Sequence, residues 1–137
     1  MRKTLLLFLM LLGFSNPVFA QKPISWDLLA KVEAKWQNNK YVTVFKPEVQ
    51  ALNGQTVKIQ GFMIPLEMGE KHKHFIIAAR PAHCYFEAPG GKEMIEIYTP
   101  TATDYEFTPI TISGKIEVLQ NDQYGMYYRI KNAKVGG

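Results

Sequence analysis

The residues best suited to chemistry lie in one short region, which contains all three histidines and the only cysteine of the chain. His72 and His74 are two residues apart, so on an extended segment their side chains point to the same side, about 7 Å apart. Two imidazoles at this spacing suit a Zn²⁺ or copper ion. Cys84, Glu70 or Met68 are candidates for the remaining ligands.

The same region also fits interpretations without a metal. Lys71 and Lys73 alternate with these histidines and would oppose a bound cation, as expected of a solvated hairpin loop. Cys84 directly follows His83, so in a strand the two side chains face opposite sides and cannot form a nucleophile–base hydrogen bond. The sequence has no serine nucleophile elbow, glycine-rich phosphate loop or paired-carboxylate motif. Catalysis is not predicted, and a thiol-dependent enzyme using Cys84 is the alternative.

Three aromatic residues are candidates for a binding surface, namely Phe62, Tyr127 and Tyr128. Tyr127 and Tyr128 are adjacent, so a strand places one ring on each face and leaves at least one exposed. An exposed ring beside a barrel groove suits a protein or small-ligand contact. A nucleic-acid partner is not expected, because the lysines and arginines are scattered along the chain.

The first twenty residues resemble a signal peptide. Arg2 and Lys3 form a basic start, Leu5–Leu12 is an apolar run, and Val18-Phe19-Ala20 has the small-x-small spacing of a cleavage site. The apolar run is too short to span a bilayer, which needs about 20 residues. We therefore expect an exported, soluble, periplasmic protein with no membrane insertion. Residues 21–137 carry a net charge of +2, because the leader holds two of the sixteen basic residues and none of the twelve acidic ones.

The mature N-terminus is predicted to be Gln21. The intact mass of the protein from the exported fraction should match a chain that begins at this residue. A chain that keeps Met1 and partitions with membranes would contradict the prediction.

One helix is predicted near the start of the mature chain. Ser25 can cap it, and its apolar residues fall on one helical stripe that ends before Asn38-Asn39. The stripe consists of Leu28, Leu29, Val32 and Trp36.

From Asn53-Gly54 onward the apolar pattern has a period of two, which predicts strands. Five strands are expected, at residues 57–66, 75–79, 94–98, 110–118 and 126–131, with a short extended piece at 84–86. Residues 67–73 are expected to be a polar loop and 99–108 a turn-rich connection. Gly61 and Gly114 lie inside strands, where a glycine permits the sharp bend of a barrel corner. The prediction is a mainly β domain over residues 21–137, a small five-stranded OB-like barrel with one N-terminal helix covering one end.

Three stretches carry a resemblance to a known family. They are LNGQTVKIQGFMIP (residues 52–65), AHCYFEAPGGKEMIEIY (residues 82–98) and PITISGKIEV (residues 109–118). In this order and spacing they are similar to the bacterial family designated domain of unknown function 3299. The resemblance implies a small exported OB-like protein. Members are often encoded beside ABC-type export or metal-uptake components, which implies an accessory role in transport or metal homeostasis.

The sequence favours an exported, non-catalytic binding module, and the family resemblance implies an accessory role in an envelope transport or metal-homeostasis system, with an envelope transporter component as its partner. The alternatives are the thiol-dependent enzyme and a Zn²⁺ or copper carrier that uses His72 and His74. A single cysteine cannot form an intramolecular disulfide, and we expect Cys84 to be a buried thiol.

Overall fold

The computed structural model describes residues 20–82 and 88–136. Its elements, in chain order, are β1 (Lys22–Pro23), α1 (Trp26–Leu29), β2 (Val32–Gln37), β3 (Lys40–Phe45), α2 (Pro47–Gln50), β4 (Thr56–Pro65), β5 (Lys71–Ala78), the 3₁₀ turn η2 (Gly91–Glu93), β6 (Met94–Asp104), β7 (Ile110–Val118) and β8 (Tyr128–Val135). Across these residues, no helix has the length and apolar character needed to cross a membrane.

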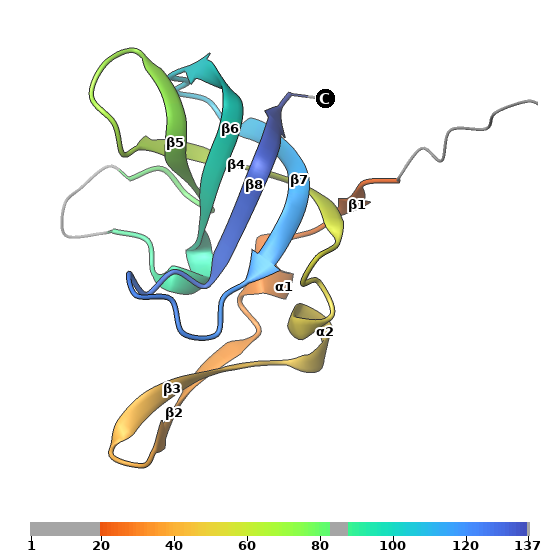
Figure 1. Ribbon diagram of the computed structural model, residues 1–137, viewed down its shortest axis with the longest axis vertical. Coiled ribbons are helices and arrows are strands. Elements are labelled where there is room, and N and C mark those ends of the chain that lie inside the picture. Colours follow the sequence, from red (N-terminus) through yellow and green to blue (C-terminus); the bar gives the residue numbers. More distant parts are fainter. Residues whose placement is uncertain (1–19, 83–87, 137) are drawn as a thin grey trace, which may run out of the picture.

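Five strands close into a barrel (Figure 1). Their order is β4-β5-β6-β8-β7, and β7 pairs again with β4, which closes the circle. Neighbouring strands are antiparallel except β6 and β8, which are parallel. This arrangement has the form of an OB barrel, so the predicted fold class is confirmed. The short strand β1 adds to the outside of β4 in parallel.

Both interior glycines lie where the barrel needs them. β4 pairs with β7 from Thr56 to Gly61 and with β5 from Phe62 onward, so Gly61 is the residue at which the strand changes partners. Gly114 lies at a register shift between β7 and β8. A Cβ atom at Gly114 would stand 2.6 Å from the Cγ2 atom of Ile130. Close approach of neighbouring chain explains a glycine at both positions.

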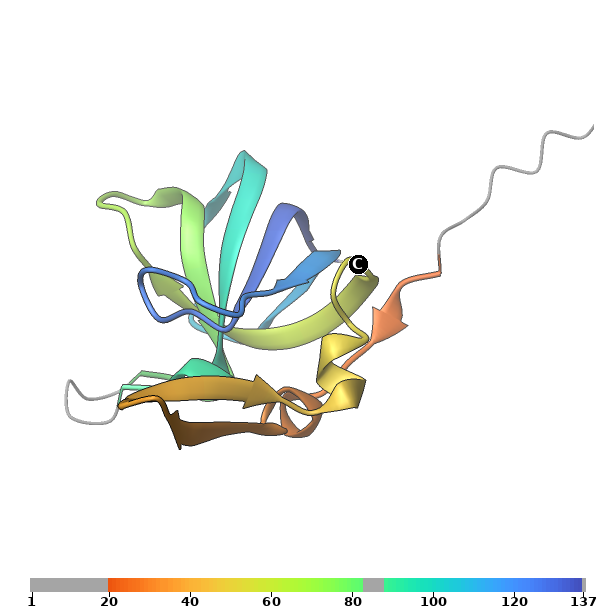
Figure 2. The same ribbon diagram turned by 60° about the horizontal axis from the view of Figure 1, so that its bottom comes forward.

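The two ends of the barrel differ. α1 and α2 lie at one end, below the barrel in Figure 1, and the β2–β3 hairpin runs beneath it in Figure 2. Leu29, Val49 and Leu52 of this N-terminal segment are fully buried in the core. The loop that joins β4 to β5 lies at the opposite end, together with the end of β6 (Figure 1). We call these the closed end and the open end.

The predicted N-terminal helix is mostly wrong. Only one helical turn forms, Trp26–Leu29, with the Ser25 side chain accepting a hydrogen bond from the backbone N–H of Leu28 as predicted. The chain then forms the β2–β3 hairpin, whose turn is Asn38-Asn39. Both asparagines have positive φ angles, 50° and 64°, the signature of a type I′ turn. Asn-Asn therefore reverses a hairpin here and does not end a helix.

The barrel strands agree with the predicted ones in number and order but differ in extent. β5 begins at Lys71, so the loop before it covers only residues 66–70, and His72 belongs to a strand. β6 continues to Asp104, through residues expected to be turn-rich. Residues 84–86 lie outside the described part of the chain.

Tyr128 joins the closed end to the barrel. Its side chain is fully buried, and its hydroxyl donates a hydrogen bond of 2.6 Å to the backbone carbonyl of Leu29 at the end of α1. Burial also raises the pKa of the phenol. The ring of Phe45 on β3 lies 5.9 Å from that of Tyr128. One side chain thus ties the last barrel strand to the N-terminal segment.

Tyr128→Phe should lower the free energy of unfolding by about 1–3 kcal/mol, because it leaves the carbonyl of Leu29 buried without its donor. Urea denaturation followed by circular dichroism measures the loss. Tyr124→Phe is the matched control, since Tyr124 is 78% exposed. Equal losses in the two variants would contradict this role of Tyr128.

Candidate functional site

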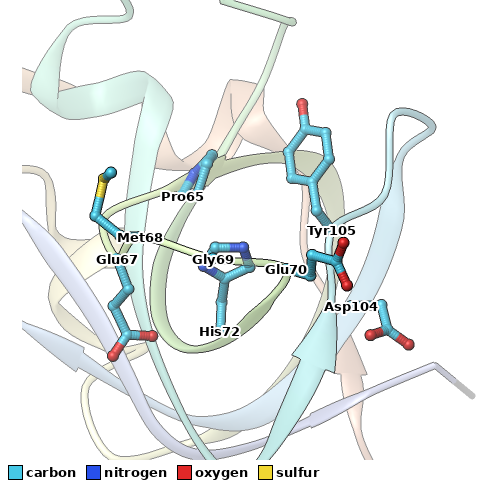
Figure 3. Close-up of a pocket in the computed structure, with 8 residues that line it drawn as sticks. All are labelled: Pro65, Glu67, Met68, Gly69, Glu70, His72, Asp104 and Tyr105. Atoms are coloured by element: carbon cyan, nitrogen blue, oxygen red, sulfur yellow. The ribbon is translucent and has the colours of Figure 1, made fainter.

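A pocket of about 640 Å³ opens at the open end of the barrel. We call it the mouth pocket. It is formed by the β4–β5 loop, the start of β5 and the end of β6 (Figure 3). Its lining residues are Pro65, Glu67, Met68, Gly69, Glu70, His72, Asp104 and Tyr105.

His72 lies at the base of this pocket. It is the second residue of β5, it is only 2% exposed, and its imidazole points into the space between the loop and Tyr105 (Figure 3). Its Nδ1 atom is buried and has no hydrogen-bond partner among the described residues. A buried polar atom left unpaired costs about 1–3 kcal/mol. Such atoms are rare in folded proteins, so this one indicates a missing partner.

Three residues that line the pocket with His72 carry carboxylates, and these differ in their partners. Glu67 accepts hydrogen bonds from the backbone N–H groups of Lys73 and His74, at 2.8 and 3.1 Å, and these bonds hold its pKa below the usual range. Asp104 forms an ion pair of 2.8 Å with Lys71. The carboxylate of Glu70 is exposed, and no group of the described residues donates to it. Glu70 is therefore the acid most available to a ligand.

The structure separates His72 from His74. Their partners on β6 are Thr103 and Tyr98, so the register of the two strands shifts between the histidines. Because of this shift His72 faces the barrel interior, whereas His74 lies on the outer face and stacks on Tyr98, with ring centroids 4.2 Å apart. The expectation that the two imidazoles point to the same side is wrong. Period-two geometry assumes a regular strand, and the irregularity breaks it.

On the outer face, His74 belongs to a cluster of charged side chains centred on Glu96. One Glu96 oxygen accepts from the Tyr98 hydroxyl at 3.0 Å and lies 2.8 Å from Nε2 of His74. The other accepts from Nε of Arg129, and Nη2 of Arg129 donates to Asp122 at 3.0 Å. Both Glu96 oxygens have partners within the protein, so the charges of this outer cluster are paired without a ligand.

Glu96 is only 6% exposed, yet its surroundings favour the ionised form of its carboxylate. Burial alone would raise its pKa, but the hydrogen bonds from His74, Arg129 and Tyr98 outweigh burial and lower the pKa below the usual value. Burial likewise acts on Asp122, and backbone donors together with Arg129 again lower the pKa. The outer cluster is a stable ion-pair network across β6, β8 and the loop between β7 and β8.

The other predicted site residues are spread over the fold. Phe62 lines a second cavity, which it shares with Tyr105 and Phe107. Tyr127 is half-buried against Phe45, with ring centroids 5.8 Å apart. Tyr128 is a core residue and offers no surface to a ligand, contrary to its prediction as a contact residue.

The structure describes only some of the predicted metal ligands. Among residues 20–82 and 88–136, no group of three or more His, Cys, Asp or Glu side chains is placed to hold a metal ion. His72 and Glu70 do line the same pocket. Cys84 lies outside the described residues. Its predicted burial and the thiol-dependent enzyme that would use it therefore stay predictions.

Sequence reasoning missed Glu67, Asp104 and Tyr105. Asp104 and Tyr105 fell in the segment expected to be a turn, because Pro100 and the threonines around it interrupt its apolar pattern. The available signal was the β-branched residues Thr99, Thr101 and Thr103, which favour an extended strand. Pairing of Lys71 with Asp104 brings both residues to the open end.

The closed five-stranded barrel with a parallel β6–β8 pair defines an OB-like domain. The family described as "Protein of unknown function (DUF3299)" matches residues 19–136, and the chain belongs to this family, as its sequence resemblance implied. A crystal structure of a DUF3299 family protein from Pseudomonas aeruginosa PAO1 is similar in fold, with a TM-score of 0.64 and 18% sequence identity. The likeness covers 85% of this chain and 95% of that one. No curated protein matches the sequence.

Proposed function

We propose that this protein is a non-catalytic binding module of the bacterial envelope and that the mouth pocket holds its ligand. The observation that carries the proposal is the buried, unpaired imidazole of His72 at the base of an open pocket. A ligand that bonds this ring supplies the hydrogen-bond partner that Nδ1 of His72 lacks among the described residues. The outer cluster has no such deficit, because its charges already pair with one another.

The envelope location rests on the leader-like residues 1–20. The proposal includes an accessory role in envelope transport or metal homeostasis, in which the module presents its ligand to a transporter component. A carrier of Zn²⁺ or copper is the second candidate, favoured by the shared position of His72 and Glu70. Such a carrier needs further ligands beyond these two, because zinc sites are usually four-coordinate.

Amide chemical-shift mapping tests the proposal. The protein is titrated in turn with Zn²⁺ and with small cationic, neutral and anionic aromatic fragments. At least one of these probes should shift the amides of residues 66–72 and 104–105, and those shifts should saturate. Saturating shifts confined to the outer cluster, at His74, Glu96 and Tyr98, would overturn the proposal, and so would a set of probes that shifts neither group.

A further inference from the structure

Resting on the proposed function, we infer that the mouth pocket selects a small organic cation, an ammonium group carried on an apolar stem. The inference comes from the unpartnered imidazole together with the charge and the walls of the pocket. Three of the eight lining residues are acidic, and none is a lysine or arginine. Lys71 balances the charge of Asp104, so the negative charge left to attract a positive group is that of Glu67 and Glu70.

The imidazole and Glu70 form the polar end of the site. A neutral imidazole carries one N–H donor and one acceptor nitrogen, and no group of the described residues bonds to either nitrogen of His72. An ammonium group has several donors and can serve the imidazole and a carboxylate together. Glu70 is the acid free to take part, since Glu67 bonds two backbone amides and Asp104 pairs with Lys71.

The rest of the pocket is apolar. Pro65, Met68 and Tyr105 contribute a ring, a thioether chain and an aromatic side chain to its walls. An apolar stem placed against these walls would be removed from water together with them.

The volume of the mouth pocket accommodates an organic cation. A volume of about 640 Å³ is within the range of small-molecule pockets. The described residues also lack a three-ligand set for a metal. Both observations agree with a molecule that has a charged end.

Three probes that share the 2-phenylethyl group and differ in the charge of their polar end test the preference for a cation. They are 2-phenylethylammonium, 2-phenylethanol and 3-phenylpropionate, whose affinities for the purified protein are measured by isothermal titration calorimetry. The ammonium should bind about tenfold or more tighter than the alcohol, because a hydrogen bond to a charged group contributes about 1.5–3 kcal/mol. The carboxylate should bind most weakly.

Glu70→Gln should weaken ammonium binding about tenfold and leave alcohol binding unchanged. Glu106→Gln is the matched control, because Glu106 is an exposed carboxylate that lines a different cavity. Equal loss in both variants would show a general charge effect and overturn the assignment to Glu70.

The outcomes separate the two proposals. If the alcohol or the carboxylate binds as tightly as the ammonium and shifts amides of residues 66–72, the pocket is the site but its preference for cations is wrong. If Zn²⁺ displaces the ammonium at equimolar concentration, a metal ion is the cation and the organic ligand is wrong. If none of the probes shifts those amides, the proposed function fails together with this inference.

Discussion

Glu96→Ala should lower the free energy of unfolding by about 3–5 kcal/mol, the cost of removing one partner from a buried ion pair. Arg129 is 16% exposed and would keep only Asp122 as a partner, while His74 and Tyr98 would lose theirs. Urea denaturation measures the change. Glu117→Ala is the control, because the pair of Glu117 with Lys131 is exposed at the surface and 3.5 Å long, so its loss should cost less than about 1 kcal/mol.

The same network predicts a pH dependence with a definite sign. The pKa of Glu96 in the folded protein lies below its usual value of 4.5, so ionised Glu96 stabilises the fold above that pH. This stabilisation is lost as pH falls through the lowered pKa. The free energy of unfolding should therefore decrease below about pH 4.5, and more steeply in the native protein than in Glu96→Ala. Parallel curves for the two proteins would contradict the role of Glu96.

Gly61→Ala should lower the free energy of unfolding by about 1–3 kcal/mol, as overpacking of a filled interior does. A Cβ atom at this position would stand 2.9 Å from the carbonyl oxygen of Ala78 and 3.0 Å from the indole ring of Trp26. The carbonyl belongs to the backbone of β5, and the indole is held by a hydrogen bond of 2.8 Å to the carbonyl of Gln60. Neither neighbour can move without disturbing the barrel corner.

Gly90→Ala is the control for this substitution. Gly90 has a φ angle of −78°, which any residue adopts, and a Cβ atom there meets nothing within 4 Å. Thermal unfolding of both variants should show a loss at Gly61 and almost none at Gly90. Equal effects would mean that glycine content, and not the close approach at the corner, determines the stability.

The barrel itself could be predicted from the sequence because its strands alternate regularly. On β4, the residues that face the barrel core are Val57, Ile59 and Met63. On β7 they are Ile110, Ile112 and Ile116. In a half-buried strand, the alternation of apolar and polar residues shows which face is buried, so the strand can be predicted from its own residues alone. The interior glycines then indicated where the sheet had to bend.

The N-terminal segment shows where local patterns fail. Leu28, Leu29, Val32 and Trp36 have helical spacing, yet Val32 and Trp36 lie on a strand. The partner strand β3 contains Val42, Thr43 and Val44, β-branched residues that favour extended structure. The choice between helix and hairpin thus depended on residues that follow the turn. The helical prediction used only residues that precede it.

The site could be predicted only in part for a related reason. His72 and Glu70 were identified as candidates from their types alone, and both line the mouth pocket. The separation of His72 from His74 could not be foreseen, because it arises from the register of β5 against a β6 that continues to Asp104. The Glu96–Arg129 pair likewise joins strands 33 residues apart in sequence.

The central claim is that the unpaired imidazole of His72 is the ligand contact of the mouth pocket. Long-range ¹H–¹⁵N NMR of the imidazole nitrogens during titration with 2-phenylethylammonium tests it most directly. His72 and His74 are assigned from His72→Asn and His74→Asn variants, and His74 serves as the internal reference. The nitrogen signals of His72 should move and saturate with the amides of the β4–β5 loop, while those of His74 stay in place. Binding that moves the His74 nitrogens and leaves those of His72 unchanged would contradict the account.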